Sequence, residues 1–149
     1  MNKRLVGAVV VCLLLVGSYV VTAQVARPYR NGSVWEVGFI RVKPGMNQAY
    51  LSYLAGDWKR EQEALKSAGI ILSYKVLQTE PHTPGDFTLM LMTEYKDLAT
   101  MEANESKADA LAQKVIGDDQ KQMQGYRERL EIREVLGSRL AREIILQPR

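Results

Sequence analysis

The sequence predicts one α+β domain, an antiparallel sheet covered by helices, preceded by a segment that directs export. The chain has 149 residues, which is enough for one domain. Runs rich in β-branched and aromatic residues alternate with stretches whose apolar residues recur every three or four positions, as in strands and amphipathic helices. The first residues join two positive charges to a long apolar run, which is typical of a secretory signal.

Residues 1–23 are expected to be a cleavable signal peptide. Lys3 and Arg4 precede an apolar run over residues 5–16, and the triplet 21–23 supplies the small residues that a signal peptidase needs. An uncleaved membrane anchor is the alternative, because residues 5–21 are close to the shortest apolar length that spans a bilayer. We expect an exported protein, periplasmic or extracellular and more in keeping with a bacterial host, without stable membrane association after cleavage.

The cysteine count and the charge balance exclude several classes of site. Cys12 is the only cysteine and lies in the signal segment, so the mature domain has no disulfide and no sulfur ligand. The formal charge is +3, but loss of Lys3 and Arg4 lowers the basic residues from 20 to 18 against 17 acidic ones, leaving +1. We therefore expect no nucleic-acid partner, which usually needs a concentrated basic patch. Phosphate-loop, zinc and calcium patterns are absent, so neither a metal nor a cofactor is expected.

The first half of the domain predicts a strand followed by a long helix. Residues 24–32 lack periodicity and are expected to form a flexible lead-in, so that the folded domain spans 33–149. Residues 33–42 predict a strand that Lys43-Pro44-Gly45 ends. Residues 47–68 predict a helix, with a charged side formed by Lys59, Arg60, Glu61 and Glu63. Its apolar side comprises Leu51, Leu54, Trp58 and Leu65.

The second half predicts two paired strands, further helices and a last strand. Residues 70–79 and 87–95 predict strands joined by the loop 80–86, and a short connection makes such strands antiparallel. Asp97 is a plausible N-cap for a second helix, which Gly117 interrupts. A further helix is expected over residues 119–135, ended by Gly137, and residues 139–147 predict the last strand.

The order β-α-β-β-α-β, with an extra helix before the last strand, is the ferredoxin-like topology, in which helices cover one face of a four-stranded antiparallel sheet. The third strand is apolar on both sides, with Leu89 and Leu91 on one side and Met90 and Met92 on the other. Helices on one face would leave the other apolar set exposed, and such a surface usually marks an interface or a binding site. We therefore predict a homodimer in which two sheets meet face to face.

One segment resembles a known superfamily. The sequence Trp-Glu-Val-Gly-Phe-Ile-Arg-Val-Lys-Pro-Gly, residues 35–45, is a first strand that ends in Pro-Gly before a long helix. With the order of elements, it resembles the dimeric α/β-barrel superfamily, which includes antibiotic-biosynthesis-monooxygenase-type, EthD-like and stress-responsive barrel proteins. The resemblance implies a barrel between two protomers, with a pocket in each between sheet and helices. It fixes no function, because the superfamily mixes oxygenases, isomerases, haem enzymes and proteins without known activity.

Aromatic residues are the candidates for ligand binding. They could line a cavity for a flat apolar ligand, although aromatic residues at helical spacing also serve as core. The candidates are Trp35, Phe39, Tyr50, Tyr53 and Tyr74.

Candidates for catalysis are Glu36, Arg41 and His82. His82 is the only histidine and lies in a loop, where a solvated side chain is the alternative to a general base. Ionised groups on a buried strand face need partners, so Glu36, Glu94 and Glu143 are expected to pair with Arg41, Arg142 or Lys75. Such groups would form either a polar pocket or a structural network of ion pairs.

Three functions follow. The leading one is an exported homodimer that binds a small apolar or aromatic molecule between sheet and helices. The second is a cofactor-independent monooxygenase or isomerase of the barrel type. The third is a structural, envelope-associated dimer without a ligand. The sequence leaves open whether the chain is an enzyme and which molecule it binds.

Overall fold

The computed structural model describes residues 27–148, so the predicted signal peptide lies outside the described residues. A four-stranded sheet comprises β1 (Tyr29–Val42), β2 (Ser73–Gln78), β3 (Leu89–Tyr95) and β4 (Arg133–Leu146). The first helical crossover comprises α2 (Asn47–Tyr53), η1 (Leu54–Trp58) and α3 (Lys59–Ser67). The second comprises α4 (Leu98–Ala103), α5 (Glu105–Val115) and α6 (Asp119–Leu130).

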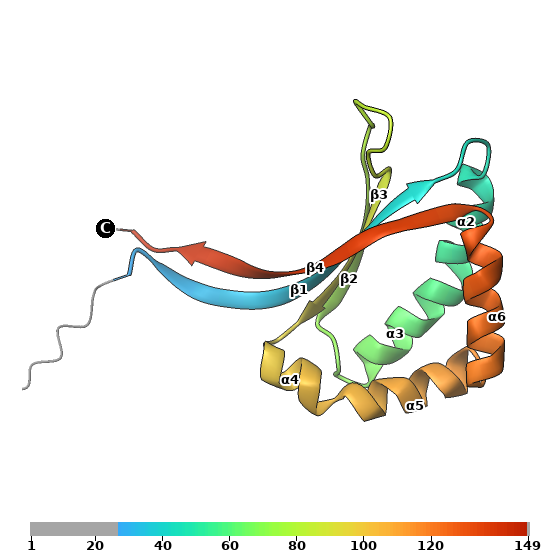
Figure 1. Cartoon of the computed structure of the whole chain (residues 1–149). Helices are drawn as coiled ribbons and strands as arrows, with labels where there is room; N and C mark the ends of the chain where they lie inside the picture. Colours follow the sequence, from blue (N-terminus) through green and yellow to red (C-terminus); the bar gives the residue numbers. More distant parts are fainter. Residues whose placement is uncertain (1–26, 149) are drawn as a thin grey trace, which may run out of the picture.

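The sheet has the ferredoxin-like order β2-β3-β1-β4, and every neighbouring pair is antiparallel. Figure 1 shows the helices together on one side of the sheet. The predicted fold class is therefore confirmed by the connections of the strands themselves.

The first crossover is one continuous helical rod with a π-helical turn in its middle. This turn, η1, contains Gly56, and α2 and α3 continue the rod on either side. A π turn holds one extra residue, so the side facing the sheet shifts by one position beyond it. Gln62, at 6% exposure, is consequently buried beside Leu65, and Thr93 Oγ1 on β3 donates a hydrogen bond to Gln62 Oε1 at 3.1 Å.

Two apolar clusters join the helices to the sheet. One contains the buried residues Ile40, Tyr50, Leu54 and Leu89, and the other contains Leu65, Ile70 and Ile71. Residues 70–72, expected in the second strand, precede β2 instead, and their two isoleucines fill the core below α3. Asp97 caps α4 as predicted, accepting a hydrogen bond from Thr100 N at 2.7 Å.

The first and last strands in the sequence, β1 and β4, are longer than predicted. β1 begins at Tyr29, so part of the expected lead-in is strand, and β4 begins at Arg133, inside the helix expected over residues 119–135. The helix α6 ends at Leu130 because the chain then pairs with β1, from Val42 opposite Arg133 onward. Gly137, with φ +143°, lies beside a register shift in β4 and does not end a helix.

β1 and β4 run beyond the rest of the sheet as a two-stranded arm. β3 pairs with β1 only from Val34 to Ile40, whereas β4 pairs with β1 out to Tyr29 opposite Leu146. The arm extends away from the helices in Figure 1. Ile144 and Leu146 on this arm are 57% and 79% exposed, so the arm carries apolar side chains into solvent.

The two faces of the sheet differ in what covers them. Register places Glu36, Gly38 and Ile40 of β1 on the helix-covered face. The other face, here called the open face, carries Trp35, Val37, Phe39, Leu77, Met90 and Met92. No helix among residues 27–148 packs on the open face (Figure 1).

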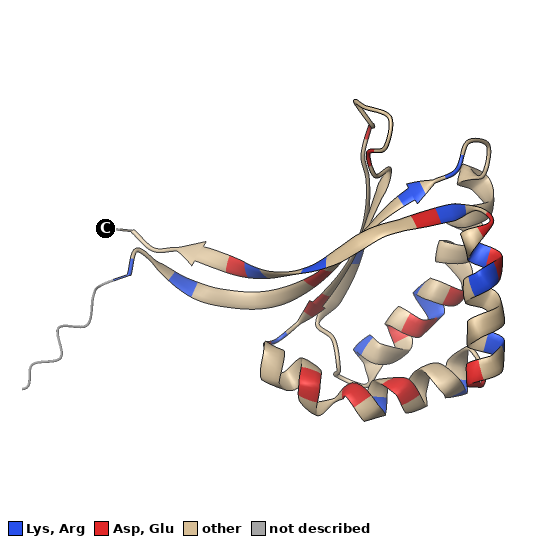
Figure 2. Cartoon of the chain, viewed as in Figure 1, with Lys and Arg blue, Asp and Glu red and all other residues tan. Residues whose placement is uncertain are grey.

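Charges of both signs alternate along the helices in Figure 2, without a basic stripe in that view. Within the described part of the chain, every helix is too short or too polar to cross a membrane.

Candidate functional site

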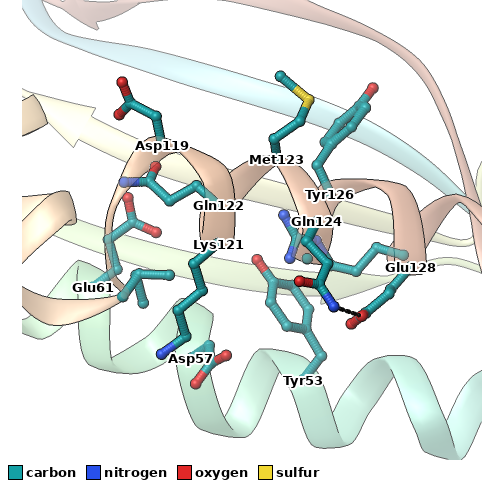
Figure 3. Close-up of a pocket in the computed structure, with 13 residues that line it drawn as sticks. Tyr53, Asp57, Glu61, Asp119, Lys121, Gln122, Met123, Gln124, Tyr126 and Glu128 are labelled. Atoms are coloured by element: carbon teal, nitrogen blue, oxygen red, sulfur yellow. Dashed lines mark hydrogen bonds between the residues drawn. The ribbon is translucent and has the colours of Figure 1, made fainter.

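A groove with a volume of about 830 Å³ lies between α6 and the first helical crossover. Tyr53, Asp57 and Glu61 line it from the first crossover. Figure 3 shows Lys121, Met123 and Tyr126 among the residues that line it from α6. We refer to it as the α6 groove. Its lining mixes both charge signs with aromatic rings, so it differs from the apolar cavity that the sequence suggests.

Arginine and tyrosine side chains alternate at one end of the α6 groove. The guanidinium of Arg129 lies 4.5 Å from the ring centroid of Tyr53, and the rings of Tyr53 and Tyr50 are stacked at 5.8 Å. The guanidinium of Arg133 lies 5.5 Å from the Tyr50 ring and 5.7 Å from the Tyr126 ring. These five residues, here called the Arg–Tyr stack, join the groove to the core, because Tyr50 is only 1% exposed. Cation–π contacts of this kind stabilise a cation where water is excluded.

Burial changes the acidity of the groups around the stack. Burial raises the pKa of Tyr50 to about 12, and it also raises the pKa of Tyr53. Both phenols therefore stay neutral at ordinary pH. Burial also raises the pKa of Glu61, against the opposing attraction of Arg129. Burial thus moves the protonation of Glu61 toward neutral pH.

Both arginines of the stack have donors without partners. Nε and Nη1 of Arg133 and Nε of Arg129 are buried, and no described residue accepts a hydrogen bond from them. Arg133 as a whole is 7% exposed. Buried charged donors are normally paired with an acceptor, and these N–H groups lack one among the described residues.

A second, smaller cleft of about 340 Å³ lies between the sheet and the helices α3 and α5. Its polar lining includes Glu36 on β1, Tyr95 on β3, Asp109 on α5 and Glu61, which also borders the α6 groove. Burial and the nearby charges of Glu36 and Glu61 raise the pKa of Tyr95. We call this hollow the inner cleft. Glu61 is the residue that belongs to both hollows.

The structure does not gather the five predicted ligand-binding residues. Trp35 and Phe39 lie on the open face, where Lys75 Nζ is 4.8 Å from the Trp35 ring centroid and Phe87 packs edge-on against Phe39. Tyr50 and Tyr53 belong to the stack on the opposite side of the sheet. Tyr74 packs edge-on against Trp58 and donates a hydrogen bond to Glu63.

The three predicted catalytic residues lie in three different places. Glu36 borders the inner cleft. Arg41 lies on the open face and forms an ion pair with Glu134. His82 lies in the loop between β2 and β3, where its backbone N–H donates to Asp86 Oδ2.

The acidic residues expected to form ion pairs make other contacts. Glu94 accepts a hydrogen bond from Ser73 Oγ, and Glu143 accepts one from Ser33 Oγ. Among the residues that the structure describes, the ion pairs are Arg41–Glu134 and Arg60–Asp57. The expected network of Glu36, Glu94 and Glu143 with strand cations is therefore not formed within one chain.

Sequence reasoning missed Glu61, Arg129, Arg133 and Tyr126. Glu61 was expected on the charged side of the helix, and the π turn between Leu54 and Glu61 makes ordinary helical spacing an unsafe guide to its position. The two arginines and Tyr126 carry no sequence signal either, because their meeting depends on how α6 packs beside α2.

No group of three or more histidine, cysteine, aspartate or glutamate side chains within residues 27–148 is arranged to hold a metal ion.

Three solved structures are similar to this chain at low sequence identity. A NIPSNAP family protein of unknown function from Agrobacterium tumefaciens is 12% identical, with 78% of this chain and 90% of that chain covered, at a TM-score of 0.47. Two dimeric ferredoxin-like proteins from an uncultured marine organism are 9% and 13% identical to this chain, each with a TM-score of 0.49. Each match covers 80% of this chain, and the matches cover 92% and 100% of the two neighbours, respectively. No protein family and no curated protein matches the chain.

Proposed function

We propose that this chain is an exported homodimer that binds a small molecule in the α6 groove. The observation that carries the proposal is the Arg–Tyr stack, because buried arginine donors without acceptors beside an open groove are a feature of binding sites more than of a closed core. The ligand we expect has an aromatic or apolar part and at least one polar group, which suits the mixed lining of the groove.

The proposed export is supported by the sequence of residues 1–23, with its positive start, apolar run and small residues before the cleavage point. The mature chain would then begin at Gln24, close to the first described residues.

The proposed dimer is supported by the open face of the sheet. Its six apolar residues form one continuous surface on adjacent strands, and such surfaces are usually covered. A second copy is the occupant we propose, because the same face carries charges of both signs. Lys75 lies opposite Met92 on this face, Arg139 lies opposite Val37, and Glu94 lies opposite Trp35. A two-fold interface pairs each surface with itself, so mixed charges can match across it.

Native mass spectrometry of the protein recovered from the exported fraction of a bacterial host tests the proposal. We expect a dimer of chains that begin at Gln24, with additional mass from a retained small molecule. A monomer would contradict the dimer, and an unprocessed chain would contradict export. A dimer that never carries or acquires added mass would favour the structural, ligand-free alternative.

A catalytic role of the barrel type, as a cofactor-independent monooxygenase or an isomerase, is the second candidate. The observation that favours it is Glu61, whose raised pKa suits proton transfer and which borders both hollows. Once a substrate is known, Glu61→Gln should abolish turnover while leaving substrate affinity within a few-fold of wild type. Unchanged turnover in that variant would remove Glu61 as the acid or base.

A further inference from the structure

Two arginines at one end of the α6 groove have buried donors for which no described residue is an acceptor. Arg133 is more than nine-tenths buried, and its Nε and Nη1 donors have no acceptor among those residues. Arg129 lines the groove, and its Nε is also buried without an acceptor among those residues. A buried donor on a charged group is costly when it is unpaired, so such donors normally face an acceptor.

The nearby side chains do not supply this acceptor. Neither arginine takes part in the ion pairs of the described residues, which are Arg41–Glu134 and Arg60–Asp57. Glu61 is close enough to interact with Arg129, but the two side chains form neither an ion pair nor a hydrogen bond. Tyr50 and Tyr53 are neutral phenols at ordinary pH, because burial raises the pKa of both.

The rings of the Arg–Tyr stack do not replace an anion either. A ring face attracts the cation as a whole, but the N–H groups of a guanidinium still require oxygen acceptors. A planar carboxylate matches the fork of guanidinium donors better than any neutral group does.

We propose that the α6 groove binds a small aromatic carboxylate, whose carboxylate group is held by Arg129 and Arg133 and whose ring lies against Tyr53 and Tyr126. This inference rests on the proposed function, because it names the ligand class of the same groove. Tyr126 is 43% exposed and its ring lies beside both the groove and Arg133. Arg133 is not among the residues that line the groove, so the proposal requires the exposed Tyr126 side chain to rotate before the carboxylate reaches that guanidinium.

Titration calorimetry of the exported protein tests the inference, with 2-naphthoate and the neutral 2-naphthamide as probes. We expect 2-naphthoate to bind at least about tenfold more tightly than the amide, since hydrogen bonds to charged groups are the stronger ones. Arg129→Gln and Arg133→Met should each weaken 2-naphthoate by about tenfold or more. Arg127→Gln is the matched control on the same helix, outside the groove, and should leave the affinity unchanged.

Urea unfolding of Arg133→Met separates binding from folding. Replacing an unpaired buried cation by an apolar residue should preserve or raise the unfolding midpoint. A lowered midpoint, with unaltered 2-naphthoate affinity in Arg129→Gln, would make the arginines structural and overturn the inference.

The remaining outcomes separate this inference from the proposed function. Equal binding of the two probes, independent of Arg129, would overturn the carboxylate inference and keep the groove as a ligand site. Binding of neither probe would also overturn it, and added mass in the native spectrum of the exported protein would then still support the proposed function independently.

Discussion

The two faces of the sheet are built from the same kinds of residue but have different surroundings. On the helix-covered face, Ile40 and Leu89 pack against Tyr50 and Leu54 and are almost fully buried. On the open face, Phe39, Met90 and Leu77 stand in register across three strands, and Leu77 at the edge is 44% exposed. A single chain therefore buries its helix-covered face almost completely and its open face only in part, with Val37 at 5% exposure in the centre of the open face.

This difference separates the surface that stabilises a single chain from the surface that we propose contacts a second copy. The helix-covered face stabilises the chain, because its side chains leave water when the helices pack. The open face is only partly buried in the single chain, with Leu77 44% exposed, and we propose that a second copy completes its burial. Substitutions on the two faces should therefore affect different equilibria.

The largest effect is expected for Met92→Asp, which places a carboxylate on the open face of each protomer. Two carboxylates buried at a two-fold interface cost on the order of 5 kcal/mol per dimer, so the dimer should dissociate. Sedimentation should give a monomer, with circular dichroism unchanged. Met123→Asp is the matched control, because Met123 is 53% exposed on α6, and it should remain dimeric. Dissociation of both variants, or of neither, would remove the open face as the interface.

A comparison of Leu89→Ala with Leu77→Ala sharpens the contrast in fold stability. Truncation of the buried Leu89 should lower the free energy of unfolding by about 2–5 kcal/mol, because it leaves a cavity below α2. Truncation of Leu77 should cost less than about 1 kcal/mol. Urea unfolding in the monomeric Met92→Asp background measures both without a contribution from dissociation. Equal losses would mean that the open face is also part of the core of a single chain.

A smaller effect is expected from pH on the helix-covered side. The pKa of Tyr50 is about 12 in the folded chain against 10.0 for an exposed tyrosine, so the unfolded chain loses this proton first. The stability due to neutral Tyr50 is complete below pH 10 and decreases as pH rises toward 12, by roughly 2–3 kcal/mol. Tyr50→Phe should flatten this part of the pH profile in urea unfolding. An equally steep loss of stability with pH in Tyr50→Phe would mean that a group other than Tyr50 causes it.

The strand order and the inward face of the first strand could be predicted from the sequence, because alternation of apolar residues sets which side each residue occupies. Glu36 and Arg41, five residues apart on β1, lie on opposite faces for this reason. The end of α6 could not be predicted, because residues 133–135, which were expected in that helix, pair with β1 instead. Their partner is remote in sequence.

The candidate site was predicted only in part. A pocket between sheet and helices was expected, and Glu36 and Tyr53 do border hollows on that side. The Arg–Tyr stack was not foreseen, because Arg129 and Arg133 meet Tyr53 and Tyr50 through the packing of α6 against α2. The π turn at Gly56, which rotates Gln62 inward, likewise has no simple sequence pattern.

The central claim is that the open face is an interface between two copies of this chain. It is tested most directly by magnetic resonance on dimers mixed from a protomer with labelled methionine methyl groups and a protomer with labelled aromatic rings. The account predicts intermolecular Overhauser effects from the methyl groups of Met90 and Met92 to Trp35 or Phe39 of the other protomer. Intermolecular effects confined to Met123 on α6, or absent altogether, would contradict it.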